Sequence, residues 1–223
     1  FQFALALIFA VSTKYGDSAN AATGIVVNGT LQNSVQSEVD HYYPFYQDVH
    51  VMIFIGFGFL MTFLKKYTFS SVGLNFIIAA FAIQWSMIVN GVVHNIYEGH
   101  ASQKISLGIT NLITSDFAAG AVLVSFGAVL GKTTPLQMLI VVIFELLVYA
   151  CNELIGAVIL GAVDMGGSIF VHTFGAYFGL ALSRTISRSK LNKDGSVKDH
   201  PLNGSNYTSD TFAMVGTIFL WMY

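Results

Sequence analysis

The sequence predicts an all-α, polytopic membrane protein. Of its 223 residues, 54% are hydrophobic and only 10% are charged, whereas a soluble domain carries about 25% charged residues. The apolar residues gather in runs long enough to cross a bilayer as helices. A net charge of −2 is too small to suggest a nucleic-acid-binding protein.

Five apolar segments are predicted to span the membrane. Pro135 suits the first turn of the fourth, with Thr134 as its N-cap. Cys151, the single cysteine, lies in the same segment and allows no internal disulfide, so we expect a buried, unreactive thiol. The approximate limits of the segments are Asp48–Leu64, Phe69–Val93, a third within Ile105–Leu130, Pro135–Ile155 and Gly166–Ser183.

The remaining residues connect or extend these helices. Residues 12–47 are predicted to form an extracellular loop, and residues 48–186 the five transmembrane helices. Residues 187–209 are predicted to form a polar cytoplasmic linker, and residues 210–223 to start a sixth helix. Phe1 to Val11 is the tail of a preceding apolar segment. Because both ends lie inside apolar runs, we expect a fragment of a longer chain.

Lysine and arginine residues gather in alternate loops, and only Lys14 and Lys104 fall in the other set. By the positive-inside rule, the loops with more basic residues are cytoplasmic. The loop with Asn28 is then extracellular, where its Asn-Gly-Thr sequence is predicted to be glycosylated. The basic residues of the cytoplasmic set are Lys65, Lys66, Lys132, Arg184, Arg188, Lys190, Lys193 and Lys198.

His172 is the histidine that the sequence places deep in the membrane. Its segment opens with Asp164, roughly 12 Å away along a helix. Ionisable groups at this depth usually line a cavity, meet a partner or belong to a pathway. The alternative is a packing imidazole bonded to a neighbouring helix. On a regular helix His172 shares a face with small residues such as Gly175 and Gly179, which lets another helix approach closely or leaves a narrow lumen.

Two more acids lie within apolar segments. Asp116 is either a polar group at a pore mouth beside an aromatic gate, Phe117, or the cap of a helix that starts near Thr114. Both interpretations stay open. Glu145 lies in the middle of the fourth segment, where we expect a protonated carboxyl bonded to a neighbouring helix or subunit.

The remaining polar candidates lie at the ends of the apolar segments. Glu153 is expected at the outer end of the fourth helix, on the same side as Asp164. His50 is expected at the membrane interface, and Asp210 near the positive end of the sixth helix. No metal site is predicted, because His172 has no His, Cys or carboxylate three or four residues away. Nucleotide-binding and nucleophile motifs are missing too, which disfavours an enzyme.

Several stretches closely resemble the animal Rh glycoproteins of the ammonium transporter (Amt/Rh) family. The resemblance covers nearly the whole chain apart from the first loop and the linker. The chain is therefore similar to the N-terminal half of an Rh-type transporter. The matching stretches are Tyr46–Met52, Gly56–Leu64, Ala79–Trp85, Phe126–Lys132, Asp164–Leu180 and Phe212–Tyr223.

This resemblance implies the first of two inverted repeats of five helices, in trimers with one narrow pore per subunit. His172 matches the first of two pore histidines, and Phe117 the first of two stacked phenylalanines at the outer entrance. Asp164 matches an invariant acid near the outer vestibule, and Glu153 a vestibular acid that concentrates ammonium. Asp116 and Asp210 complete the predicted set of transport residues.

The implied function is ammonium/ammonia transport across the plasma membrane, with ammonium losing a proton at the mouth and ammonia passing the histidines. The alternatives are a non-conducting structural subunit and a carbon dioxide channel. The expected partners are ammonium or ammonia, membrane lipid, and a homotrimer or a heterotrimer with related Rh subunits; no cofactor or nucleic acid is expected. One repeat does not enclose a pore, so we expect residues 1–223 alone not to conduct and to leave apolar surface unpaired.

Overall fold

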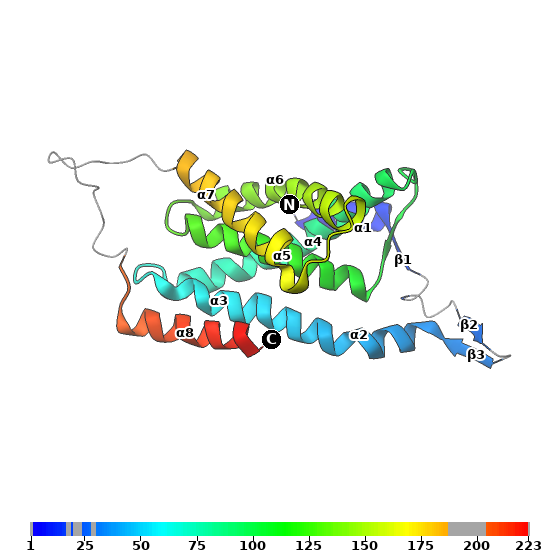
Figure 1. Ribbon diagram of the computed structural model, residues 1–223, viewed down its shortest axis with the longest axis horizontal. Helices are drawn as coiled ribbons and strands as arrows, with labels where there is room; N and C mark the ends of the chain where they lie inside the picture. The colour runs from blue at the N-terminus through cyan, green and yellow to red at the C-terminus, as the bar shows by residue number, and fades with distance from the viewer. Residues whose placement is uncertain (1, 17–18, 20–23, 28–29, 187–203, 223) are drawn as a thin grey trace.

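The computed structural model describes residues 2–16, 19, 24–27, 30–186 and 204–222. Within them, five helices are long and apolar enough to cross a membrane (Figure 1). The polytopic, mostly helical architecture is therefore confirmed. The five spans are Glu38–Phe63, Thr68–Tyr97, Ile109–Val129, Pro135–Ile159 and Met165–Ile186.

The first span belongs to a helix that begins well before the expected Asp48. Helix α2 covers Ser34–Val51 and continues through a π-helical turn, η2 (Met52–Gly56), the short α3 (Phe57–Leu60) and a 3₁₀ turn, η3 (Met61–Phe63). The sequence pattern marks only the apolar part of a helix, whereas backbone hydrogen bonds continue into its polar part. Much of the expected first loop is therefore helical.

The second and third spans are α4 (Thr68–Tyr97) and α5 (Ile109–Val129). Gly108 precedes α5, and its backbone N–H donates to Oδ1 of Asn111 at 2.8 Å. The start of α5 thus lies between the two starting points considered from the sequence, and Asp116 lies about two turns inside the helix.

The fourth span joins α6 (Pro135–Glu153) to a π-helical turn, η4 (Leu154–Ile159). The predicted cap of α6 is confirmed, because the Gln137 backbone N–H donates to Thr134 Oγ1 at 3.3 Å. The predicted burial of Cys151 is wrong, since its side chain is exposed on α6. An apolar run shows that a segment suits the membrane, but not which of its faces packs inside the protein.

The fifth span follows a sharp turn. It consists of a 3₁₀ turn, η5 (Met165–Gly167), a π-helical turn, η6 (Ser168–Thr173), and α7 (Phe174–Ile186). Gly166 and Gly167 both have φ near +70°, a backbone conformation that favours glycine. This pair of glycines reverses the chain before it enters the helix.

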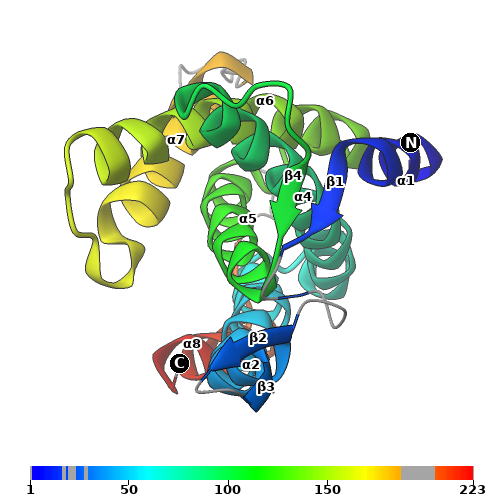
Figure 2. The same ribbon diagram turned by 90° about the vertical axis from the view of Figure 1, so that its right-hand side faces the viewer.

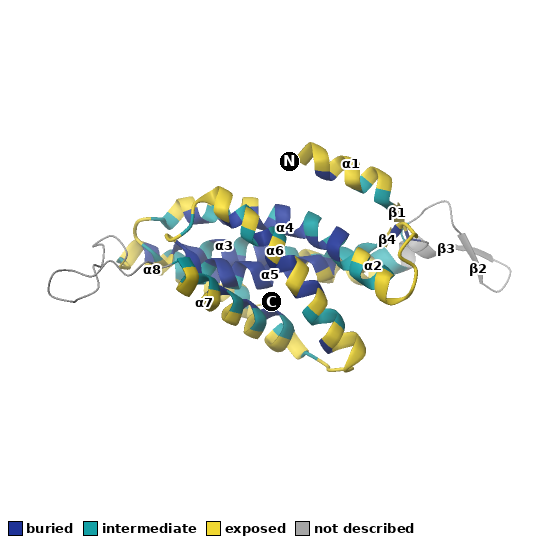
Figure 3. Cartoon of the chain, turned by 90° about the horizontal axis from the view of Figure 1, so that it is seen from above, coloured by how far each residue is buried: buried dark blue, intermediate teal, exposed yellow. Residues whose placement is uncertain are grey.

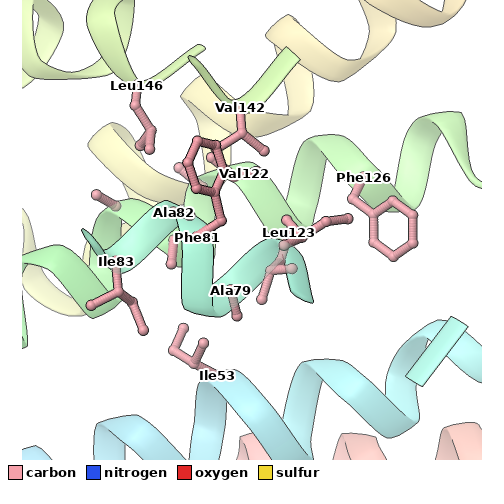
Figure 4. Close-up of a cluster of buried hydrophobic side chains, with 14 of the residues drawn as sticks. Ile53, Ala79, Phe81, Ala82, Ile83, Val122, Leu123, Phe126, Val142 and Leu146 are labelled. Carbon is pink, nitrogen blue, oxygen red and sulfur yellow. The ribbon is translucent and has the colours of Figure 1, made fainter. Parts of the chain in front are cut away.

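Helix α5 lies at the centre of the bundle. Figure 2, seen along the bundle, shows α5 surrounded by α2, α4, α6 and α7. Its small side chains Ala118, Ala119 and Ala121 are fully buried. In Figure 3 the residues coloured as buried lie mainly along α4 and α5. Side chains of α4, α5 and α6 meet in the core drawn in Figure 4.

The sixth helix, α8 (Tyr207–Met222), lies antiparallel to α2 and α3 (Figure 1). Glycines allow this close contact: a Cβ on Gly216 would lie 2.3 Å from the Leu60 nitrogen, and one on Gly56 would lie 2.8 Å from Cδ2 of Leu220. The predicted sixth helix therefore forms and begins slightly before residue 210. Most of the expected linker, residues 187–203, lies outside the described residues.

Short strands join the helices at one end of the bundle. A further helix, α1 (Gln2–Ser12), leads into β1 (Thr13–Tyr15), which pairs in parallel with β4 (Ile105–Leu107). The strands β2 (Gly24–Val27) and β3 (Thr30–Asn33) pair antiparallel.

The described basic residues divide between the two ends of the bundle. Lys14 pairs in register with Ser106, next but one to Lys104. At the other end, Lys132 Nζ donates to Ser183 Oγ at 2.6 Å, beside Arg184. This division agrees with the predicted alternation of loops. Which end is cytoplasmic stays a prediction.

Candidate functional site

A pocket of about 1020 Å³ opens among α2, α3, α5, α6 and the turn before α7. It contains four of the six predicted transport residues, Phe117, Glu153, Asp164 and His172, which come from three separate spans or their ends. Most of its remaining wall is apolar. The other lining residues are Phe45, Met52, Phe57, Leu60, Met61, Phe63, Gly120, Val124, Gly127, Tyr149, Gly166, Gly167, Phe170, Val171 and Leu220.

Asp164 caps the helical segment that carries His172. Its carboxylate accepts the backbone N–H of Ile169 at 2.9 Å and that of Phe170 at 2.8 Å, and the hydroxyl of Ser168 at 2.9 Å. These donors are among the backbone groups that a helix start leaves without partners. The acid thus fixes the turn from which His172 projects.

The same contacts control the ionisation of Asp164, which lies just outside the fifth span. Desolvation by burial raises the pKa of Asp164, but the backbone N–H groups of Phe170 and Ile169 and the Ser168 hydroxyl lower it by more. The resulting pKa lies below its ordinary value of 3.8. Asp164 is therefore an anion at neutral pH.

His172 lies in the π-helical turn and is exposed to the pocket. The prediction that His172 shares a face with Gly175 and Gly179 is wrong. Val171, the preceding residue, is buried together with these glycines, while His172 is exposed. A π turn holds more residues than an α turn, so residues before and after it lose their regular alignment. Within the described residues, His172 makes no hydrogen bond or ion pair.

The small residues of α7 pack closely against α5. A Cβ on Gly175 would lie 2.5 Å from the Ala121 carbonyl oxygen, and one on Gly179 would lie 2.8 Å from Cα of Ser125. Of the two outcomes left open for the small face, close approach of another helix is the one observed.

Asp116 is fully buried and does not line the pocket. Its carboxylate pairs with His50, whose Nδ1 lies 3.1 Å from Oδ2. Because Asn111 is the polar side chain at the start of α5, the capping interpretation of Asp116 is wrong. The neighbouring Phe117 does line the pocket, with its ring centroid 6.3 Å from that of Phe45.

Glu153 lies at the end of α6, half-buried between two hollows. Its Oε2 accepts a hydrogen bond from Asn90 at 3.4 Å. The second hollow, of about 360 Å³, lies behind it and includes the polar residues His94, Asn111 and Thr114. Glu153 thus forms part of the wall that separates the apolar pocket from this more polar space.

The structure does not bring every predicted residue to the pocket. Asp210 is exposed in the first turn of α8, where a carboxylate stabilises the helix start, and it does not line the pocket. Asn28 lies outside the described residues. No group of three or more His, Cys, Asp or Glu residues that could hold a metal ion occurs in the described part of the chain.

Two features of this region were not predicted from the sequence. His50 was expected at the interface, but it pairs with a residue 66 positions away. The partner of Glu145 is Ser125 on α5. The expected bond to a neighbouring helix therefore forms, although no local pattern indicated which helix supplies it.

Residues 18–223 match the model of the Ammonium Transporter Family. The chain belongs to this family. Curated relatives in the family include the ammonium transporter Rh type B of Danio rerio, 50% identical over 98% of this chain and 45% of its own length. The Rh type B-B transporter of Xenopus laevis is also 50% identical, over 100% of this chain and 46% of its own length.

A solved structure of the family has the same fold. Rh50 of Nitrosomonas europaea, described as one of the Rhesus protein family of channels, matches with a TM-score of 0.67 at 26% identity. The match covers 84% of this chain and 48% of that one. The resemblance to Rh-type transporters is thus confirmed, and the chain spans about half the length of the curated relatives it matches.

Proposed function

We propose that the full-length protein conducts ammonium or ammonia across the plasma membrane, through a pore of which the described pocket is one wall. The observation that carries this proposal is the meeting of Phe117, Glu153, Asp164 and His172 in a single, mostly apolar pocket. Membership of a family named for ammonium transport supports the substrate. The second wall belongs to the half of the relatives' length that this chain does not span.

The arrangement favours a cation at the mouth and a neutral species farther in. The carboxylates of Glu153 and Asp164 and the ring faces of Tyr149 and Phe117 attract ammonium. An unpaired ion in an apolar passage would pay a large desolvation cost. Release of a proton at the mouth yields ammonia, which avoids most of that cost.

His172 then offers ring nitrogens that donate or accept a hydrogen bond according to the tautomer. Its side chain is exposed to the pocket and has no partner among the described residues, so it is available to a passing molecule. Asp164 holds the turn that presents it. We further propose a trimer, either of identical chains or with related Rh subunits.

The test is ammonium uptake by the full-length protein in cells that lack their own transporters. We expect His172→Ala to change the flux, or the selectivity for ammonium over methylammonium, at unchanged surface expression. The matched control is Tyr177→Phe, which removes a polar group from the same helix at a side chain that is 73% exposed and outside the pocket.

Two results would overturn the proposal. Absence of ammonium flux in a protein that reaches the cell surface would favour a structural subunit. Carbon dioxide flux that persists in Glu153→Gln while ammonium is not carried would favour a gas channel. Unchanged ammonium flux and selectivity in His172→Ala would remove His172 from the pathway.

A further inference from the structure

Glu145 is a buried acid that the proposed transport route does not use. It lies near the middle of α6, in a membrane-length helix, and its side chain has 0% exposure. It does not line the pocket. In the described part of the chain, no Lys, Arg or His pairs with it. A carboxylate in this position would be a buried charge with no counter-ion.

Counting hydrogen atoms assigns its protonation state. The hydroxyl of Ser125 on α5 is hydrogen-bonded to Oε1 of Glu145 and lies 2.8 Å from the carbonyl oxygen of Gly175 on α7. A hydroxyl has one hydrogen to donate, and a carbonyl oxygen has none. Ser125 therefore donates to Gly175, and the hydrogen between Ser125 and Glu145 comes from the carboxyl group.

The second carboxyl oxygen agrees with this assignment. Oε2 of Glu145 is buried and has no hydrogen-bond partner among the described residues. In a neutral carboxyl group this atom is the carbonyl oxygen, which is cheaper to leave unpaired than an ionised oxygen. Each bond thus has one donor and one acceptor, in the order Glu145, Ser125, Gly175.

The three linked residues come from three different helices, at a level where α7 packs closely on α5. Gly175 follows the π-helical turn and is three residues after His172. A Cβ on Gly175 would lie 2.5 Å from the Ala121 carbonyl oxygen, so the α7 backbone lies directly on α5 there. A bond to the Gly175 carbonyl therefore fixes the depth and rotation of the segment that carries His172.

We propose that Glu145 is a positioning residue for transport: in its protonated form it holds α7 on α5 through Ser125, and so places His172 in the pocket. This inference rests on the proposed function. It assigns Glu145 no part in moving protons. The acid could then be replaced by any side chain of similar shape that donates one hydrogen bond to Ser125.

The test compares Glu145→Gln with Glu145→Leu in the full-length protein. The Gln carboxamide donates to Ser125 and is neutral at every pH, so flux and its pH profile should match those of the unmodified protein. Leu keeps the bulk but donates nothing, and we expect flux to fall roughly tenfold to a hundredfold, as displaced groups elsewhere do. Phe144→Leu is the control on α6, since Phe144 adjoins Glu145 in the chain but is 62% exposed and takes no part in this chain of bonds.

Ser125→Ala tests the same link from α5, without altering the acid. It should lower flux as Glu145→Leu does, and the double variant should be no worse than either single one, because residues of one hydrogen-bonded chain are not additive. Fully additive losses would contradict the link between Glu145 and Ser125. Lost flux or a flattened pH profile in Glu145→Gln would overturn the proposal in favour of an acid that carries protons.

Infrared spectroscopy gives a readout that does not depend on transport. The purified protein at neutral pH should show the carbonyl band of a protonated carboxyl, which disappears in Glu145→Gln. Absence of that difference would mean that Glu145 is ionised and would overturn the assignment. A protein with this band that carries no ammonium would instead contradict the proposed function and leave the protonated link intact.

Discussion

The imidazole of His50 lies 3.1 Å from the carboxylate of Asp116 and joins α2 to α5 immediately beside Phe117. Asp116 is completely buried, whereas the His50 side chain is 38% exposed. The ring of His50 also contacts Tyr46 and Phe54 on its own helix, with centroids 5.0 and 4.7 Å away. This pair anchors the part of α5 from which Phe117 reaches the pocket.

Replacing His50 with alanine should destabilise the full-length protein. The change leaves a buried carboxyl group without its partner, which costs about 1–3 kcal/mol. We expect a lower unfolding temperature in detergent and reduced ammonium flux through displacement of Phe117. His100→Ala is the control, because His100 pairs with Glu98 in an exposed loop. Equal unfolding temperatures for the two variants would contradict the anchoring role.

Replacing Asp164 with alanine should loosen the turn that carries His172. The substitution removes the acceptor for the N–H groups of Ile169 and Phe170, and loss of a helix-capping side chain costs about 0.5–2 kcal/mol. Transport should be lost even though the chain still folds. The measurement is uptake normalised to surface expression, with Asp210→Ala as the control acid. Near-normal uptake in Asp164→Ala would show that the turn does not need its cap.

The lowered pKa of Asp164 predicts where its stabilising effect is lost. A group whose pKa is depressed in the folded state stabilises it above the unfolded pKa, and the effect disappears as pH falls through the folded value. For Asp164 this occurs below pH 3.8. Any change in transport between about pH 5 and 8 should therefore come from other groups, such as histidine side chains, which ordinarily titrate near pH 6.5. The variant Asp164→Glu, if it retains flux, should therefore have the same midpoint in its profile of flux against pH as the unmodified protein. A midpoint between about pH 5 and 8 that shifts in this variant would contradict the prediction.

The contact between α5 and α7 should tolerate no added side chain at Gly175. In Gly175→Ala the new Cβ would lie 2.5 Å from a backbone oxygen of Ala121, and overpacking of this kind costs about 1–3 kcal/mol. The matched control is Gly73→Ala in α4, where a Cβ meets nothing within 4 Å. Measured by unfolding temperature, the first variant should be less stable, and the second unchanged or more stable. A Gly175→Ala variant that is more stable than Gly73→Ala would mean that α5 and α7 can move apart without loss of stability.

Much of the fold could be predicted because its signals are local. Long apolar runs indicate membrane-spanning helices. The bilayer core contains no water to bond the backbone, so a segment that crosses it must satisfy its own backbone hydrogen bonds, as a helix does. The Thr134 cap depends on neighbouring residues alone. Asp164 and His172 were also identified together, because both belong to one short segment whose polar residues are unusual among apolar ones.

The rest depended on which helix faces meet. The partners of Asp116 and Glu145 lie on other helices, 66 and 20 positions away in the chain, and no residue pattern specifies a contact over that distance. The exposed Cys151 and the exposed His172 also follow from helix rotation, which packing and a π-helical turn decide.

By itself, the sequence determined which segments enter the membrane and which of them carry ionisable groups, since both follow from the transfer of side chains and backbone out of water. Only the tertiary structure decided which of those groups share a pocket and which pair with one another. The physical reason is that hydropathy acts on each residue separately, whereas a hydrogen bond between helices requires both to have a particular rotation and depth.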